Sequence, residues 1–308
     1  MGIRKVLVTG SSGTIGTRLC ERLQAETDYQ VAGVDRRPNA WNPAVQQITT
    51  VADLLDLSTF AILPTDVDLV IHLAANARVH DVVLDPDQAR DNFLTVYNVL
   101  EFCRRNKIPR VLFSSSREVY GNDGGLVHTE EPVLIYHCES PYAASKVAGE
   151  ALVRSYRQCY GIEFINVRFS NVYGMYDESD RVVPLFIKLL KEQQDLTIYG
   201  QDKLLDFTYI DDAVHGVMQA LARFDRARNE VYNLAFGAGT TLLEVAETLR
   251  SRLGSTSRIQ MGEVRPGEVV KYVADITKAR ERLLYQPQVT FAEGIERAVQ
   301  WYEANLYP

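Results

Sequence analysis

Two stretches of the chain carry side chains whose types and spacing suit acid–base chemistry. In SPYAASKVAGE (140–150), Tyr142 and Lys146 lie four residues apart, so on a helix they share one face. A free phenol, with a pKa of about 10, is a poor base at neutral pH, but a neighbouring ammonium favours the phenolate. The pair therefore predicts proton transfer with a substrate hydroxyl. The alternative is an unreactive surface pair, since this spacing also arises by chance.

The second stretch is FSSSREVYG (113–121), which follows the apolar run IPRVLF (108–113). It supplies three serine hydroxyls, the cation Arg117 and the carboxylate Glu118 at the end of a predicted strand. In an open α/β sheet, ligands bind outside the carboxyl ends of the strands. Glu118 could work there as an acid or base, or it could order the loop by pairing with an arginine. The residues alone leave both roles open.

A glycine-rich stretch, TGSSGTIG (9–16), joins the first predicted strand to the first predicted helix. Its small residues let the backbone approach a pyrophosphate, and the helix N-terminus offers free N–H groups. Asp35 ends the next strand about 20 residues later, where a carboxylate accepts hydrogen bonds from an adenosine ribose. A carboxylate there repels a 2′-phosphate, so the sequence favours NAD over NADP, although Arg36 and Arg37 could soften that preference. The alternative is a tight turn whose glycines serve only helix–sheet packing.

The elements that must position these residues alternate along the chain. The strand-like runs are KVLVTG (5–10), YQVAGVD (29–35), DLVIHLAA (68–75), RVLFSSS (110–116) and IEFINVRFS (162–170), with helix-like runs at 14–26, 88–105 and 140–160. This alternation predicts an α/β fold with a doubly wound parallel Rossmann sheet. A smaller C-terminal substrate domain is expected to be interleaved with it. We expect the sheet domain at 1–170, with a later return at about 206–238, and the smaller domain at 171–205 and 239–308.

Composition narrows the functional classes. The 33 Lys and Arg residues against 40 Asp and Glu give a net charge of −7, which disfavours general nucleic-acid binding. We expect no membrane helix, because no apolar run approaches roughly 20 residues, and no signal peptide, because the chain enters a strand at once. The four cysteines show no metal or CxxC spacing, so we expect no metal and reduced thiols in a cytoplasmic protein.

The motifs together resemble the extended short-chain dehydrogenase/reductase family, specifically its NAD-dependent nucleotide-sugar epimerases, dehydratases and decarboxylases, with UDP-glucose 4-epimerases as the most similar group. The resemblance covers essentially the whole chain. It rests on TGSSGTIG, Asp35, Asp53, Leu54, HLAA (72–75), Asn92, SSSREVYG, YAASK, RFSNVYG (168–174), DFTYIDD (206–212) and RPGE (265–268). It implies bound NAD, a nucleotide-sugar substrate, and a homodimer that pairs the helices at 88–105 and 140–160.

The resemblance also implies a role for each site residue. Tyr142 takes the proton from the sugar 4-hydroxyl while C4 gives hydride to NAD, Lys146 binds the nicotinamide ribose, and Ser116 positions the hydroxyl. The cofactor set is Gly10, Gly13, Thr14, Ile15, Gly16, Asp35, Arg36, Asp53, Leu54, Leu73, Ala74, Ala75, Asn92, Ser114, Tyr142, Lys146 and Ser170. The substrate set is Ser116, Asn171, Tyr199, Arg265 and Glu268.

The leading interpretation is 4-epimerisation of a UDP-hexose of the glucose/galactose type, with N-acetyl and uronic acid forms left open. The family's dehydratases carry an Asp-Glu pair before VYG, where this chain has Arg117-Glu118, and arginine is a poor proton donor at neutral pH. A decarboxylase or dehydratase using Glu118, a keto-sugar reductase and a non-catalytic dinucleotide sensor remain alternatives. A second departure is Leu205, where the family commonly has arginine; Lys203 could substitute only as a point charge.

Overall fold

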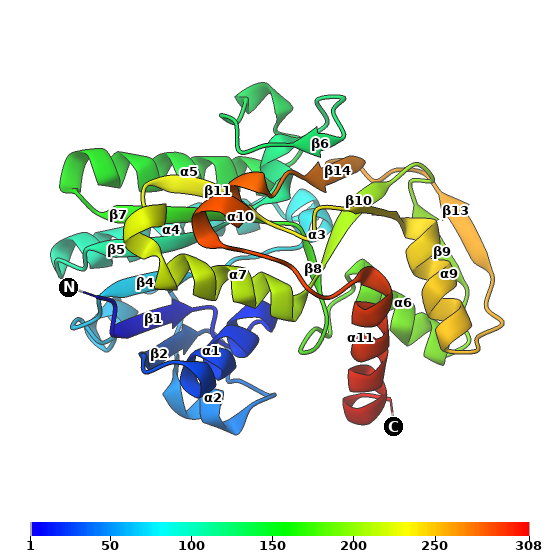
Figure 1. The fold of residues 1–308 in the computed structure, drawn as a ribbon, viewed down its shortest axis with the longest axis horizontal. Helices are drawn as coiled ribbons and strands as arrows, with labels where there is room; N and C mark the ends of the chain where they lie inside the picture. The colour runs from blue at the N-terminus through cyan, green and yellow to red at the C-terminus, as the bar shows by residue number, and fades with distance from the viewer. Residues whose placement is uncertain (1, 308) are drawn as a thin grey trace.

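The computed structural model describes residues 2–307, and its largest unit is a seven-stranded sheet (Figure 1). Every neighbouring pair of strands in it is parallel, in the order β11-β7-β5-β4-β1-β2-β3. The strands are β1 (Lys5–Thr9), β2 (Gln30–Asp35), β3 (Thr49–Val51), β4 (Leu69–His72), β5 (Arg110–Ser116), β7 (Glu163–Phe169) and β11 (Glu230–Leu234). The predicted doubly wound parallel α/β fold is confirmed.

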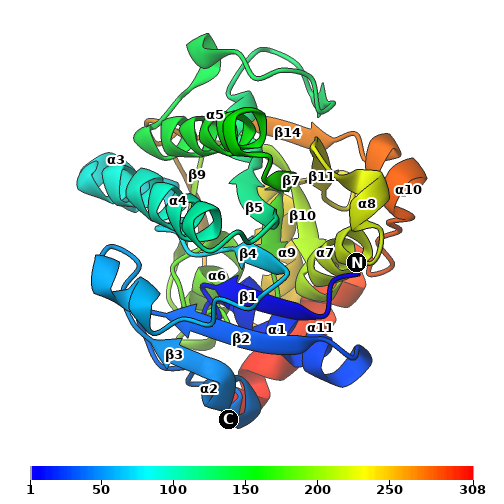
Figure 2. The same cartoon turned by 90° about the vertical axis from the view of Figure 1, so that its left-hand side faces the viewer.

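Helices cover both faces of this sheet. α4 (Asp87–Arg105) and α5 (Pro141–Tyr160) lie on one side, and α1 (Thr14–Glu26) and α7 (Ile210–Ala222) on the other (Figure 2). Because successive strand side chains point to opposite faces, Val6 and Val8 join the core under α1, whereas Leu7 joins the core under α4. The shorter helices are α2 (Pro43–Ile48), α3 (Val79–Leu84), α8 (Phe224–Ala227) and α10 (Thr277–Leu283).

The strand order reverses between β1 and β4, which are neighbours in the sheet although β2 and β3 lie between them in sequence. Connections that leave β1 and β4 run to opposite sides, so a crevice opens at the carboxyl ends of these two strands. Gly10 follows β1 and Leu73 follows β4, which brings both predicted cofactor segments to this crevice.

A smaller part of the molecule is built around a second sheet. It contains β6 (Val127–His128), β8 (Asn171–Tyr173), β10 (Leu204–Tyr209), β12 (Gly239–Thr241) and β14 (Lys271–Ala274). A two-stranded sheet of β9 (Leu196–Tyr199) and β13 (Ile259–Gly262) lies beside α6 (Val182–Lys191) and α9 (Leu242–Arg252). α11 (Phe291–Asn305) packs against α9 and β10. β11, predicted as a late return, pairs with β7 in the large sheet.

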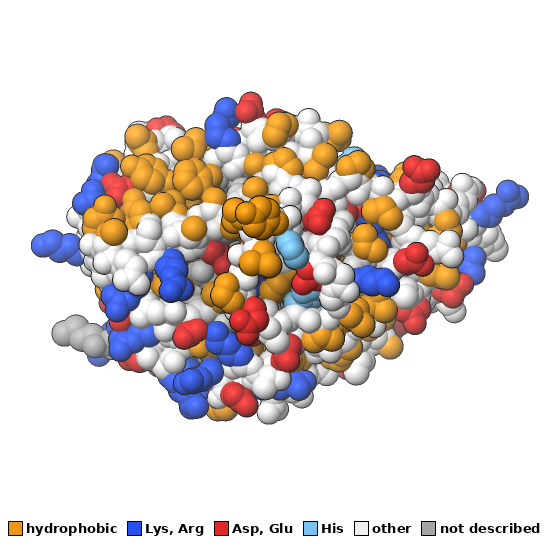
Figure 3. Space-filling model, turned by 90° about the horizontal axis from the view of Figure 1, so that it is seen from above, with side chains coloured by type: hydrophobic (Ala, Val, Ile, Leu, Met, Phe, Trp, Pro, Cys, Tyr) orange, Lys and Arg blue, Asp and Glu red, His pale blue; other side chains and the backbone are white. Residues whose placement is uncertain are grey.

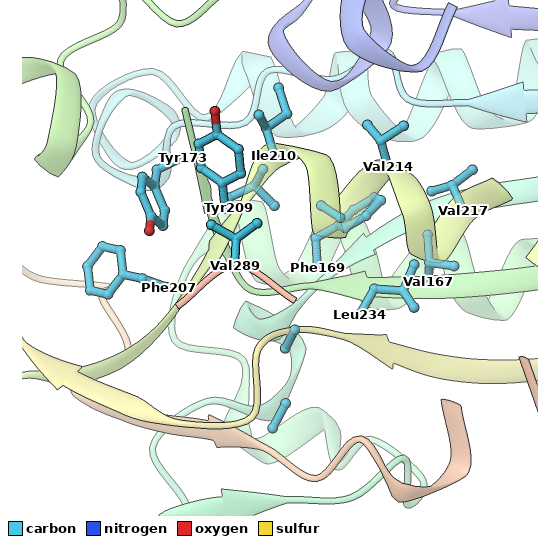
Figure 4. Packing of buried hydrophobic residues seen from close by; sticks show 14 of the residues in the cluster. Val167, Phe169, Tyr173, Phe207, Tyr209, Ile210, Val214, Val217, Leu234 and Val289 are labelled. Carbon is cyan, nitrogen blue, oxygen red and sulfur yellow. The ribbon is translucent and has the colours of Figure 1, made fainter. Parts of the chain in front are cut away.

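One continuous core joins the two parts. Phe169 of β7, Tyr209 of β10, Val214 of α7 and Leu234 of β11 all belong to it (Figure 4). Because α7 follows β10 directly, a single strand–helix unit connects the second sheet to the first. The site at the crevice is therefore framed by rigid elements from both parts.

An aromatic cluster forms a second contact between the large-sheet part and the smaller part of the molecule. The rings of Trp41 and Trp301 lie 5.2 Å apart, and Tyr176 lies within 6.0 Å of both. The backbone oxygen of Tyr176 accepts the hydroxyl of Thr14, the first residue of α1, at 3.0 Å. The cluster thus connects α11 to the start of the helix that follows the glycine loop.

The loop before α5 exposes apolar side chains. Leu134, Ile135 and Tyr136 are all exposed, Tyr136 to 90 %. Figure 3 looks onto the molecule from above and shows hydrophobic side chains gathered on that face. No helix within residues 2–307 is both long enough and apolar enough to cross a membrane.

Candidate active site

The glycine loop leaves its backbone open toward the crevice. Gly10 has a φ of +76°, and a Cβ on Gly16 would lie 1.9 Å from the Gly10 oxygen, so the sharp turn into α1 requires these glycines. Gly13 caps α1 without a side-chain hydrogen bond, so the first N–H groups of the helix, including those of Thr14 and Ile15, stay available to an anion. The Ser12 hydroxyl is buried without a partner. These features fit the diphosphate of a dinucleotide.

Asp35 lies beside this loop, at the end of β2. Its carboxylate accepts the N–H of Ser12 at 3.0 Å and that of Arg37 at 2.9 Å. Arg36 donates instead to the Asn76 side chain at 3.3 Å. The structure therefore places the carboxylate at the loop, as predicted, and holds it there through backbone groups.

The end of β4 forms the other wall of the crevice. A Cβ on Gly10 would meet the Ala74 nitrogen at 2.8 Å, so the two loops are in close contact. The buried Asn92 holds the same segment, because its side chain accepts the N–H of Asn76 at 2.7 Å and donates to the Asn76 oxygen at 3.0 Å. Two further predicted cofactor positions, Leu73 and Ala75, lie in the same loop after β4. The other two, the exposed Asp53 and the buried Leu54, follow β3.

Ser116, Tyr142 and Lys146 come together where β5 ends and α5 begins. Ser140 caps α5 by accepting the N–H of Ala143 at 3.1 Å, which sets the helix that carries Tyr142 and Lys146. The Lys146 ammonium donates to the Ser114 oxygen at 2.9 Å and lies 5.7 Å from the Tyr142 ring centroid. Both side chains are buried, so the crevice shields their chemistry from water.

Burial dominates the protonation of this group. It raises the pKa of Tyr142 to about 12, which a hydrogen bond with Ser116 partly offsets. It lowers the pKa of Lys146 to about 8, which the charge of Glu150 opposes. The sequence predicted that the charge of Lys146 would favour the phenolate. In the chain itself, burial is the largest influence on the pKa of Tyr142, and it raises that pKa.

Glu150, one helical turn beyond Lys146, anchors α5 to the sheet. Its carboxylate accepts two hydrogen bonds from Arg168, at 2.9 Å and 2.8 Å, and one from the Ser115 hydroxyl at 2.5 Å. Arg168 is almost wholly buried, with 2 % of its side chain exposed. This pair links α5, β5 and β7 directly behind the reactive group.

Glu118 and Arg117 form a buried ion pair immediately after Ser116. The Arg117 Nη2 atom lies 2.7 Å from Glu118 Oε1, and Arg117 Nε donates to Asn171 Oδ1 at 3.2 Å. Burial raises the pKa of Glu118, and the charge of Arg117 opposes that rise. From the sequence, Glu118 was expected either to act in chemistry or to pair with an arginine that could not be identified. In the structure that arginine is the adjacent residue, Arg117.

The remaining substrate positions lie on or beside the two smaller sheets: Asn171 begins β8, Tyr199 ends β9, and Arg265 and Glu268 lie between β13 and β14. The Arg265 guanidinium stacks on the Tyr199 ring, 3.9 Å from its centroid. Glu268 pairs with the buried Lys203. Leu205 is buried in the core of β10, and Asn171 donates to the Asp206 oxygen at 2.9 Å.

Ser170 and His72 complete the surroundings. The Ser170 hydroxyl lies 2.6 Å from that of Thr208, which ties the end of β7 to β10. Sequence reasoning missed His72, which is buried at the end of β4, 2.7 Å from the Thr9 hydroxyl. Burial lowers its pKa to about 3, so it stays neutral. His72 begins the HLAA motif, but its imidazole was not assigned a role from the sequence.

Comparison with known proteins identifies the family of the chain. Residues 6–235 match the model of the NAD dependent epimerase/dehydratase family. A putative UDP-glucose 4-epimerase of Methanocaldococcus jannaschii is 32 % identical over 312 residues, covering 97 % of this chain and 99 % of the relative.

Two solved structures are similar over nearly their full length. The dTDP-glucose 4,6-dehydratase DesIV of Streptomyces venezuelae, with NAD bound, has a TM-score of 0.90 at 28 % identity; the match covers 98 % of this chain and 97 % of DesIV. The UDP-glucose 4-epimerase of Thermus thermophilus, in complex with NAD, has a TM-score of 0.87 at 28 % identity; the match covers 98 % of this chain and 100 % of the epimerase. The cofactor of this chain is NAD, and the chain belongs to the NAD-dependent epimerase/dehydratase family, of the extended short-chain dehydrogenase/reductase type.

Proposed function

We propose that the protein is a 4-epimerase of a UDP-hexose, acting through a transient 4-keto sugar. The observation that carries this choice is the Arg117–Glu118 ion pair beside the Ser116, Tyr142 and Lys146 cluster. Both epimerases and a dehydratase are similar to the chain, so similarity alone does not separate the two reactions. Elimination requires a proton donor next to Glu118, and a guanidinium cannot fill that role at neutral pH.

In this proposal the crevice residues hold NAD. The N–H groups at the start of α1 bind its diphosphate, Asp35 binds the adenosine ribose, and Lys146 binds the nicotinamide ribose. When bound, NAD accepts hydride from C4 of the sugar and returns it. The contact between Gly10 and Ala74 keeps the two loops close enough for one cofactor to touch both.

The chain's own residues move the proton. Tyr142 Oη takes it from the 4-hydroxyl and later gives it back to the keto oxygen, while the Ser116 hydroxyl hydrogen-bonds the same oxygen. A tyrosine with a pKa of about 12 needs positive charge nearby to act as a base at neutral pH. The Lys146 ammonium supplies one such charge from its place beside the ring.

We assign the nucleotide diphosphate to Arg265, in the loop between β13 and β14, and to Asn171 at the start of β8. Arg265, held flat by Tyr199, presents a planar fork suited to phosphate oxygens. Asn171 lies between Arg117 and β10 and is proposed as a second contact. Glu268 pairs with Lys203, so a role for Glu268 at the nucleotide ribose requires its other oxygen or a change of partner. Residues 171–205 and 239–308 are proposed to form the sugar-nucleotide-binding domain.

We further propose a homodimer through α4 and α5, which contact each other within one chain. The outer side of α4 exposes Phe93, Leu94 and Tyr97, and an apolar helix face of this kind suits a second copy of the same helices.

A second reaction class is kept open by one feature of Glu118. The raised pKa of this buried carboxylate is a property that general acids and bases share. A decarboxylase or dehydratase that uses Glu118 is therefore the alternative.

Liquid chromatography coupled to mass spectrometry separates these reactions, because epimers of equal mass differ in retention and the other products differ in mass. The protein is incubated, without added cofactor, with UDP-glucose, UDP-N-acetylglucosamine, UDP-glucuronate and dTDP-glucose. A new isomer of unchanged mass is expected. Loss of water or carbon dioxide would contradict the epimerase and assign chemistry to Glu118, and no turnover of any substrate would favour the dinucleotide sensor.

A further inference from the structure

The segment 174–181, which we call the strap, connects β8 to α6 and runs against the start of α1. The Tyr176 backbone oxygen accepts the Thr14 hydroxyl at 3.0 Å, and the Tyr176 hydroxyl donates to Glu21 at 3.0 Å. Tyr176 also has a φ of +65°, a left-handed conformation that bulky residues adopt only where their surroundings impose it. This end of the strap is therefore held beside the glycine loop, at the helix start that suits a diphosphate.

The strap also reaches the other wall of the crevice. Asp180 Oδ2 lies 3.2 Å from Arg78 Nη1, and Arg78 is the N-cap residue of α3, in the loop that follows β4. The same nitrogen of Arg78 lies 3.1 Å from Asp81 Oδ2, in the first turn of α3. Burial raises the pKa of Tyr142, and the charge of Arg181, the last residue of the strap, opposes that rise. The strap is thus tied to both walls and ends near the reactive tyrosine.

A cavity of about 190 Å³ borders the middle of the strap. Residues 178–180 line one side of it, and Leu185 of α6 and Tyr302 of α11 line another. The Tyr302 hydroxyl donates to the Asp177 backbone oxygen, so the strap is anchored as far as Asp177 and borders open space beyond it. A close-packed interior resists movement, whereas a segment beside a cavity can be displaced into it. The middle of the strap can therefore move away from Arg78 while its ends stay in place.

The contact between Arg78 and Asp180 is weak enough to open. Their side chains are 31 % and 59 % exposed, and an ion pair in contact with water contributes little free energy, and less as salt is added. Arg78 keeps Asp81 as a partner when it separates from Asp180, so opening leaves no uncompensated guanidinium. Opening of this contact therefore requires little free energy.

We infer that Arg78 and Asp180 act as a clasp that holds the strap across the NAD crevice and slows release of the bound cofactor. A dinucleotide bound between the glycine loop and the β4 loop lies between the two points at which the strap is attached, at Thr14 and at Arg78. Arg78 and Asp180 are positioning residues in this role, since they act on the strap and not on the reacting atoms. The inference depends on the cofactor of the family and not on the proposed reaction.

Release of NAD is measured directly, without a sugar substrate. The protein loaded with isotope-labelled NAD is mixed with an excess of unlabelled NAD, and the label retained after rapid gel filtration gives the rate of release. At about 10 mM salt, where screening is weak, Asp180→Asn is expected to release NAD about two- to fivefold faster than the wild type. The difference should shrink at about 500 mM salt, because salt already weakens the clasp of the wild type.

A double-mutant cycle assigns the effect to the pair. Arg78→Gln should accelerate release to a similar degree, and Arg78→Gln/Asp180→Asn should be no faster than the faster single variant, because both substitutions open the same contact. The matched control is Asp66→Asn, which breaks the exposed ion pair of Asp66 with Lys5, 2.6 Å apart, at the amino ends of β1 and β4. Its rate of release should equal that of the wild type.

Three results would overturn the inference. Unchanged release in Asp180→Asn would mean that the contact does not retain NAD. Slower release in Asp180→Asn would mean that Arg78 binds NAD itself and that Asp180 competes for the guanidinium. Additive effects of the two substitutions in the double variant would mean that the residues act independently. Product analysis with the UDP-sugars tests the proposed reaction separately, so either proposal can fail while the other stands.

Discussion

Replacing Glu150 by glutamine should destabilise the protein strongly, because it isolates a buried charge. Arg168 makes two hydrogen bonds to Glu150, and 2 % of the arginine and 12 % of the glutamate side chain are exposed. Breaking a buried pair by removing one partner costs about 3–5 kcal/mol. The Ser115 hydroxyl also loses a charged acceptor, so we expect the loss of stability to lie in the upper half of that range of about 3–5 kcal/mol.

Urea unfolding of four proteins measures this effect. The set is the wild type, Glu150→Gln, Arg168→Gln and the double variant, compared through their free energies of unfolding. The double variant should recover part of the loss, because no uncompensated charge remains in it. The matched control is Glu163→Gln: its partner Arg228, at 2.6 Å, is 46 % exposed, so the change should cost no more than about 1 kcal/mol.

The same substitution also reports on the reactive lysine. The Glu150 charge opposes the lowering of the Lys146 pKa, so Glu150→Gln should move the alkaline limb of the activity profile to lower pH. The reasoning would be refuted if Glu150→Gln cost less than about 1 kcal/mol, or if the limb did not move in the folded variant. The first result would mean that another group balances the charge of Arg168, and the second that Glu150 does not control the pKa of Lys146.

Three further predictions concern the crevice. Burial lowers the pKa of Lys146 to about 8 in the folded protein, against 10.5 for an ordinary lysine. Below pH 8 the buried ammonium therefore opposes folding. Between pH 8 and 10.5 only the unfolded state keeps the proton, so stability increases with pH there. Stability to urea should thus rise from pH 8 to 10, and Lys146→Met should add about 3 kcal/mol at pH 7 and abolish that rise; a flat profile would contradict the burial argument. Gly16→Ala should abolish NAD binding or folding, judged by bound cofactor and circular dichroism, because its Cβ would lie 1.9 Å from the Gly10 oxygen; normal NAD content would contradict the tight turn. Tyr142→Phe should lower kcat by roughly 10²- to 10⁴-fold while UDP-sugar affinity is kept, and unchanged turnover would remove the proposed base.

The large sheet was predictable because its strands carry a local signal. Buried parallel strands such as β4 and β5 read as continuous apolar runs. The predicted bounds of β5, 110–116, are the observed ones, whereas β4 ends at His72 and not at the predicted residue 75. The second sheet had no such signal. β6 pairs with β14, Val127 with Val273, although the two strands are far apart in the sequence, and strands this short have no periodicity to detect.

The site shows the same division. The order of the glycine loop, Asp35, Ser116 and Tyr142 was enough to predict that they meet, because parallel strands bring their carboxyl ends to one edge. The partners of Arg117 were not predictable, since they depend on where β8 places Asn171 and on how the adjacent Glu118 turns inward. The raised pKa of Tyr142 follows from burial, which a helix-face argument does not include.

The aromatic cluster between the two parts gives the protein a built-in optical probe. Trp41 and Trp301 are its only tryptophans, and they lie 5.2 Å apart in one cluster with Tyr176. Tryptophan fluorescence therefore originates entirely where α11 meets the segment around Tyr176, whose backbone oxygen accepts the Thr14 hydroxyl. Its emission will follow separation of the two parts, or movement at the start of α1, without any label.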